Sequence, residues 1–164
     1  ERLQVYHASI QQFSNSTIQP VSRSTNQPIS QSTKYDLIIS NPPFFENHLK
    51  SNNAKRNLAL HGAKLSLEEL LGAIDKNLKD DGSFAVLLAY HRTEQFIDRA
   101  AQQNFNLREK ILVKQTPDHN YFRTILLFTR HEVSTKKSEI IIQDEDGKYT
   151  NEFVELLKDY YLYL

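Results

Sequence analysis

The sequence predicts an open α/β fold, in which helices cover a mostly parallel β-sheet and an antiparallel hairpin forms one edge. Short apolar runs typical of buried strands alternate with stretches whose apolar residues recur at helical spacing. Two later apolar runs, 107–115 and 122–130, follow one another without a helix between them, which indicates the hairpin. The length of 164 residues suits one core, so we expect a single domain over 1–164.

The composition excludes several classes of protein. The chain has no cysteine, which rules out disulfides and thiolate metal sites, and its six histidines lack ligand spacing, so we expect no metal. The formal net charge is zero, so only a local basic patch could attract a polyanion. No apolar run approaches the ~20 residues that span a bilayer, and the N-terminus shows no secretory signal. We therefore expect a cytoplasmic protein with no membrane partner; its oligomeric state is left open.

The N-terminal part combines one strand with a segment of different character. Residues 3–9 look like the end of a strand. Residues 14–34 contain an eight-residue near-repeat of Ser, Thr, Gln and Pro, at 16–23 and 24–31. This segment has too little apolar surface to offset its ordering entropy, so we predict a flexible surface insertion. The nearly continuous apolar run 35–40 then predicts a strand covered on both faces.

Helices and strands alternate after this point. Ser66 and Glu69 form a capping box for a helix over 66–82, with Gly82 in its C-terminal turn. Thr93 is expected to open the second helix. The remaining predicted elements are strand 83–90, helix 93–104, the hairpin strands 107–115 and 122–130, strand 139–143, and helix 151–164 with Tyr160, Tyr161 and Tyr163 packed along it.

The strand over 35–40 ends at Asn41-Pro42-Pro43-Phe44, where ligands bind in open α/β sheets. The Asn41 side-chain oxygen and the Pro42 carbonyl could each accept a hydrogen bond from an exocyclic amine and so free its lone pair. Consecutive prolines stiffen the loop and lack N–H groups, and Phe44 could stack on a flat base. The pattern predicts chemistry on a ring amine; the alternative is a turn without a catalytic role.

The segment "YDLIISNPPFFENHLKS" resembles the motif of S-adenosylmethionine-dependent methyltransferases that act on amino groups. Together with "KRNLALHG", "LSLEELL", "DGSFAVLL", "RTILLF" and "DYYLYL", it makes residues 35–164 similar to the tRNA(Val) adenine-N6 methyltransferase family. The resemblance implies a Rossmann-like class I methyltransferase fold with S-adenosylmethionine as cofactor and tRNA as partner. The implied reaction is methyl transfer to N6 of an adenine in the anticodon loop.

The resemblance also implies roles for individual residues. Asn41, Pro42, Pro43 and Phe44 fall on the catalytic motif. Ser9 lies near where such enzymes touch the cofactor's adenine, and Asn41 would touch the cofactor as well. The segment after the motif tends to face substrate, although Leu60 stands where the family commonly has a second arginine. The implied substrate-binding residues are Phe45, Lys55, Arg56, His61 and Arg123.

Arg123 follows Tyr121 and Phe122 on the predicted hairpin. Aromatic and cationic residues together there could grip single-stranded RNA. A packed aromatic at the sheet edge is the alternative for Phe122.

One family feature is missing. The four glycines are isolated and no G-x-G occurs, although these enzymes hold the cofactor on a glycine-rich loop after the first strand. We expect that loop and the N-terminal strands to precede Glu1, which makes this chain the carboxyl-terminal part of an enzyme. Alone, it is expected to bind S-adenosylmethionine weakly or not at all, and micromolar binding in a calorimetric titration would contradict this.

Two alternative functions remain open from the sequence. The same motif could serve another amine, such as guanine N2 in rRNA, adenine or cytosine in DNA, or a protein glutamine. A truncated, inactive relic that binds RNA is the other alternative.

Overall fold

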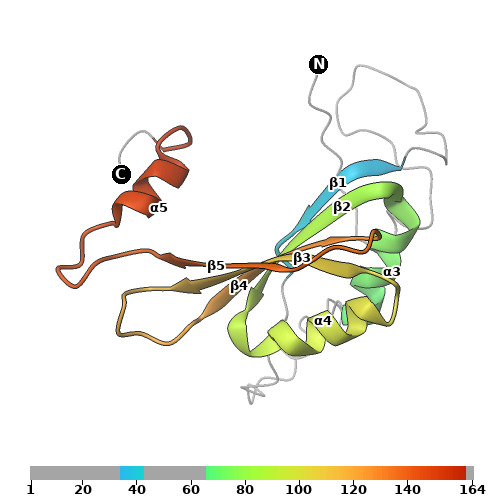
Figure 1. The fold of residues 1–164 in the computed structure, drawn as a ribbon, viewed down its shortest axis with the longest axis horizontal. Helices are drawn as coiled ribbons and strands as arrows, with labels where there is room; N and C mark the ends of the chain where they lie inside the picture. The colour runs from blue at the N-terminus through green and yellow to red at the C-terminus, as the bar shows by residue number, and fades with distance from the viewer. Residues whose placement is uncertain (1–33, 43–65, 162–164) are drawn as a thin grey trace, which may run out of the picture. The chain divides into compact units, whose positions relative to one another are not determined.

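The computed structural model describes residues 34–42 and 66–161. The chain divides into two compact units, Glu1–Asp36 with Pro43–Asp80 and Leu37–Pro42 with Asp81–Leu164. Figure 1 shows the described elements. These are β1 (Tyr35–Ser40), α3 (Leu67–Asn77), β2 (Leu78–Ala89), a 3-10 turn (Tyr90–Arg92), α4 (Thr93–Ala101), β3 (Asn106–Lys114), β4 (Arg123–Thr129), β5 (Lys136–Ile141) and α5 (Asn151–Leu157).

The described strands form one sheet in the order β1-β2-β4-β3-β5. β4 pairs antiparallel with both β2 and β3, so the predicted hairpin pairing is confirmed. Its expected place at the edge is wrong for this sheet, because β5 pairs parallel with β3 on the outer side. The edge strand β5 begins at Lys136 and Lys137, and charged edge strands resist pairing with other chains.

β2 and β4 bury the same face of the sheet in the second unit. The buried cross-strand partners are Phe84 with Phe128, Val86 with Leu126, and Leu88 with Thr124. The Phe84 ring stacks on Phe128 at 4.9 Å and meets Phe105 edge-on at 4.9 Å. Phe96 of α4 lies 5.7 Å from Phe128, so α4 covers this face of the sheet.

α4 is shorter than the predicted helix over 93–104. The Phe105 N–H donates to the Ala100 carbonyl at 3.1 Å, and the Asn104 N–H donates to the Ala101 carbonyl at 3.0 Å. Asn104 has a φ of 61°, a left-handed conformation that asparagine tolerates better than most residues. This hydrogen-bond pattern is a Schellman motif, and it turns the buried Phe105 toward the aromatic core.

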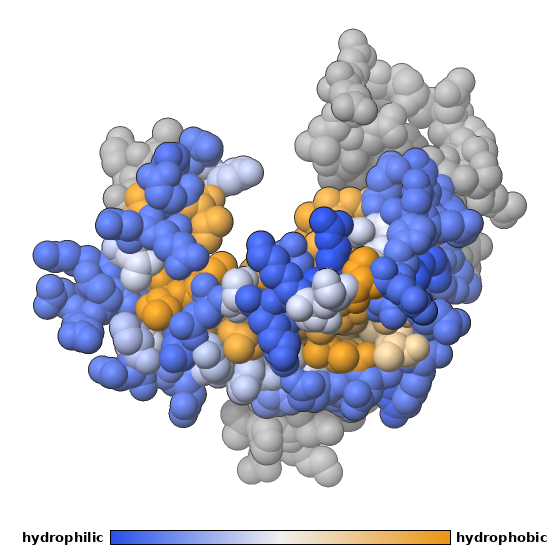
Figure 2. All heavy atoms as spheres, viewed as in Figure 1, coloured by the Kyte–Doolittle hydropathy of each residue, from blue (hydrophilic) through white to orange (hydrophobic). Residues whose placement is uncertain are grey.

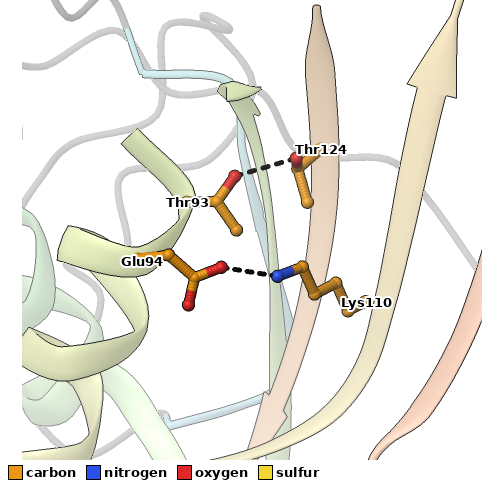
Figure 3. A network of polar contacts seen from close by, with 4 residues as sticks. All are labelled: Thr93, Glu94, Lys110 and Thr124. Carbon is orange, nitrogen blue, oxygen red and sulfur yellow. Dashed lines mark hydrogen bonds and ion pairs between the residues drawn. The ribbon is translucent and has the colours of Figure 1, made fainter. Parts of the chain in front are cut away.

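α4 begins at Thr93, as predicted, although the Thr93 side chain does not cap it. Its hydroxyl donates to the Thr124 hydroxyl at 2.8 Å, and both residues are buried (Figure 3). A second polar contact joins α4 to β3, from the Lys110 ammonium to the Glu94 carboxylate at 2.6 Å (Figure 3). Satisfying a buried hydroxyl outweighs a cap here, because an unpaired buried polar group is costly.

Replacing Thr93 with valine is expected to lower the free energy of unfolding by about 1–3 kcal/mol, because Thr124 is then left buried without its partner. The double variant Thr93→Val/Thr124→Val is expected to recover much of the loss, since two methyl groups of matching shape replace the hydrogen-bonded pair. Urea unfolding of the single and double variants measures both. If the loss of unfolding free energy in the double variant equalled the sum of the losses in Thr93→Val and Thr124→Val, the two hydroxyls would not be coupled.

The described part of the first unit contains α3 and its flanks. The predicted capping box is confirmed: the Glu69 N–H donates to the Ser66 hydroxyl at 3.0 Å, and the Ser66 N–H donates to the Glu69 carboxylate at 2.9 Å. Ion pairs join Lys34 with Asp80 at 3.4 Å and Lys79 with Asp36 at 2.7 Å. The hydrogen bond from Lys79 lowers the pKa of Asp36 below its ordinary value.

The predicted end of this first helix is wrong. α3 stops at Asn77, and the residues from Leu78 through Gly82 belong to β2. Leu78 is extended, with its N–H bonded to the Ile74 carbonyl. Gly82 therefore does not form a helix C-terminal turn but is a buried strand residue. Leu78 fits the apolar spacing of the helix α3 and of the strand β2, so the sequence pattern does not show which of them contains its buried side chain.

Two expectations about apolar surface also fail. Leu37 and Ile39 of β1 are 54% and 75% exposed, so β1 is not covered on both faces. The last helix ends at Leu157, and Tyr160 and Tyr161 are exposed rather than packed along it. Figure 2 shows apolar surface beside α5 and over the strands, interrupted by hydrophilic residues. Strand 3–9, the insertion up to residue 33, and Tyr163 lie outside the described residues.

Candidate active site

Asn41 directly follows β1 and is exposed, while the next residue, Pro42, is buried. β1 is the neighbour of β2 in the sheet, and in Figure 1 the two strands run in the same direction. Asn41 therefore follows the strand that lies beside β2. The buried proline fixes the backbone after Asn41, and the carboxamide itself faces solvent, where a ligand could reach it.

The described residues include only part of the predicted site. Asn41, Pro42 and Arg123 are described. The other predicted residues lie outside the described ranges: Ser9, Pro43, Phe44, Phe45, Lys55, Arg56 and His61. The structure therefore gives the places of the predicted carboxamide and of one predicted substrate-binding cation.

Arg123 opens β4 beside the end of β2. It lies opposite Ala89 of β2 and Val113 of β3. The Tyr90 N–H donates to the Phe122 carbonyl at 3.0 Å, so the hydrogen bonding between β2 and β4 continues one residue past the last paired residues, Ala89 and Arg123. The Arg123 guanidinium lies 5.8 Å from the Phe122 ring centroid, within cation–π range. Both residues are exposed, so a cation and an aromatic face are offered together.

Tyr121 is held at this edge by three neighbours. Its hydroxyl donates to the Glu139 carboxylate at 2.6 Å, and that bond raises the pKa of the Tyr121 phenol above its ordinary value. The Lys114 ammonium lies 4.9 Å from the ring centroid and 3.7 Å from Glu139. The Tyr90 ring is 5.3 Å away at a tilt of 45°. Because the phenol stays protonated at neutral pH, it remains a hydrogen-bond donor to Glu139.

Tyr90, Lys114 and Glu139 also lie here, and the sequence did not predict them as site residues. A usable signal existed for Tyr90, which follows the apolar run of β2 at its carboxyl end, the place where open α/β sheets bind ligands. Glu139 gave no such signal, because it belongs to β5 and its neighbourhood depends on the pairing of β5 with β3.

The residue types found here suit a polar ligand that contains flat rings. At the paired ends of β2 and β4, Tyr90 and Phe122 supply aromatic faces and Arg123 supplies a positive charge, while Asn41 supplies an amide directly after β1. Within residues 34–42 and 66–161, no group of three or more His, Asp or Glu side chains could hold a metal ion. Among the helices that the structure describes, none is both long and apolar enough to cross a membrane.

Curated relatives match nearly the whole chain. It is 33% identical over 165 residues to a protein of Proteus mirabilis named tRNA1(Val) (adenine(37)-N6)-methyltransferase, which covers 98% of this chain and 60% of the relative. Proteins with the same name from Dyadobacter fermentans and Flavobacterium psychrophilum are 32% and 30% identical over 99% of this chain, and 62% and 63% of their own lengths. No family model matches. The chain spans about three fifths of the length of these relatives.

A solved structure shows a related fold. The predicted O-methyltransferase Atu636 from Agrobacterium tumefaciens superposes with a TM-score of 0.50 at 14% identity, over 57% of this chain and 45% of that one. This likeness concerns the fold alone. The described elements are part of a Rossmann-like class I methyltransferase fold, as predicted, and the resemblance found in the sequence motifs is confirmed by the relatives.

Proposed function

We propose, starting from a chain homologous to tRNA (adenine-N6)-methyltransferases, that its protein transfers a methyl group from S-adenosylmethionine to N6 of an adenine in tRNA. The observation that carries the proposal is the exposed Asn41, placed directly after β1, the neighbour of β2. The relatives' name supplies the substrate class.

Asn41 solves a specific chemical problem. The N6 lone pair of adenine is delocalised into the ring, so the amine is a poor nucleophile. The Asn41 side-chain oxygen and the Pro42 carbonyl are two acceptors for the two N6–H bonds. Accepting both hydrogens draws the nitrogen toward tetrahedral geometry and localises the lone pair. The two acceptors belong to adjacent residues, and Pro42 is buried, so their backbone is fixed before substrate arrives.

The described residues fit part of a cofactor site. The Asn41 carboxamide can both donate and accept hydrogen bonds, which suits the polar groups of S-adenosylmethionine, and it is exposed at the expected edge. Bound there, the sulfonium would supply an electrophilic methyl group. Ser9 and Asn41 are the residues of this chain proposed to touch it, and the isolated glycines offer no cradle for its methionine half.

The test is a methyl-transfer assay with radiolabelled S-adenosylmethionine and the full-length natural protein. Unmodified total tRNA is the expected acceptor, and digestion to nucleosides should recover the label in N6-methyladenosine. Label in rRNA guanine, DNA or protein glutamine would instead identify another amine as the acceptor. Binding of tRNA without label in any acceptor would contradict the proposal and favour an inactive relic.

A further inference from the structure

We infer that Tyr90 and Phe122 form a stacking platform for an unpaired base of the RNA substrate, with Arg123 at its phosphate. The inference rests on the proposed function and adds that the bound part of the tRNA is single-stranded. Tyr90 directly follows β2, and Phe122 directly precedes β4. The Tyr90 N–H donates to the Phe122 carbonyl at 3.0 Å, so the two backbones are joined.

Exposure of the two rings is the first argument. Each residue is 40% exposed, whereas the phenylalanines further along the same strands are fully buried. A folded chain gains free energy by covering such rings, so two exposed aromatics on adjoining strand ends indicate a surface that a ligand covers.

Preorganisation is the second argument. Tyr121 lies against Tyr90 and is itself fixed by the Glu139 hydrogen bond and by Lys114. These contacts connect β3, β5 and the segment that precedes β4. The Tyr90 ring therefore has a rigid neighbour, which lowers the entropy lost when a base stacks on it.

Charge is the third argument, and it selects RNA over an apolar partner. Arg123 is exposed at the platform and lies over Phe122. The nearby carboxylate of Glu139 already interacts with Tyr121 and Lys114, while Asp118 lies in the loop between β3 and β4. Single-stranded RNA is bound by aromatic faces that stack on bases together with cations at phosphates. An apolar protein segment would leave Arg123 desolvated without a partner.

The test measures binding of two RNA probes to the natural full-length protein. One probe is a labelled stem-loop with adenines in its loop, and the other is a fully paired duplex of the same composition. Tyr90→Leu and Phe122→Leu keep apolar volume but remove the aromatic face. Each is expected to weaken stem-loop binding about 5- to 100-fold and to leave duplex binding unchanged, because a paired duplex offers no unstacked base.

Matched variants separate stacking from charge and from folding. Tyr90→Phe and Phe122→Trp keep a ring and are expected to bind the stem-loop as the natural protein does. Tyr160→Ala removes an aromatic that is 83% exposed elsewhere, and it should change neither probe. Arg123→Gln is expected to weaken both probes, with a shallower dependence on salt.

Two outcomes would overturn the inference. Leucine variants that bind the stem-loop normally would show that no base stacks on the platform, even if tRNA methylation stands. If the leucine variants weakened binding of the stem-loop and of the duplex equally, the two rings would not be specific for an unpaired base. A natural protein that methylates no tRNA would instead defeat the proposed function, and binding and methylation are therefore measured separately.

Discussion

Replacing Asn41 with alanine is expected to lower the rate of methyl transfer to tRNA by at least about 10²–10³-fold, the loss typical when one preorganised polar group that acts in the transition state is removed. Asn41 stands exposed at the end of β1, and its oxygen is one of two acceptors proposed for the adenine amine. Alanine leaves one N6–H without its partner, so the lone pair stays in the ring. The measurement is single-turnover methyl transfer by the natural full-length protein.

The control is Asn41→Asp, which keeps an acceptor oxygen in nearly the same place and is expected to retain more activity than alanine. Binding of S-adenosylmethionine by the alanine variant should weaken by no more than about 10-fold, the worth of one ordinary hydrogen bond. Ser40→Ala, one residue earlier in β1, should leave the rate near its natural value. Full turnover by Asn41→Ala would refute the role given to the carboxamide.

Replacing Phe128 with alanine is expected to lower the free energy of unfolding by about 3–5 kcal/mol. Phe128 is fully buried, stacks on Phe84 at 4.9 Å and touches Phe96 of α4 at 5.7 Å. Its removal leaves a cavity between the sheet and α4 that the two neighbouring rings, Phe84 and Phe96, would have to move to fill. Because small domains are stable by only about 5–15 kcal/mol, much of the stability would be lost.

Phe122→Ala is the matched control, since it makes the same chemical change at a ring that is exposed at the sheet edge. It is expected to cost below about 1 kcal/mol. Chemical unfolding followed by circular dichroism measures both variants. A similar loss for Phe122 and Phe128 would mean that the core described around Phe84 does not dominate the stability of this unit.

The alternating pattern of the sequence was enough to predict most of the sheet. Phe84, Val86 and Leu88 repeat at a period of two, and β2 buries them all. Ser66 with Glu69 predicted the start of α3 because a capping box is a local signal, complete within four residues. The place of Asn41 was predicted equally well, because it needs only the end of one strand.

Failures occurred where distant residues decide the outcome. The start of α4 at Thr93 was predicted, but the bond of its hydroxyl to Thr124, 31 residues later, was not. The end of α3 was misplaced because Leu78 suits a helix and a strand alike. Tyr121 is positioned by Glu139, and only the pairing of β5 with β3 brings the two together. Such contacts carry no local pattern.

The central place of β4 sets the order in which this sheet can be completed during synthesis. β2 and β3 precede β4 in the chain, yet neither is the other's neighbour, and both pair with β4. A nascent chain that has emerged only through Lys114 therefore holds two strands whose shared partner is still in the ribosome. β2 and β3 can join one sheet only after β4 has emerged through Thr129, and β5 is added to that sheet afterwards.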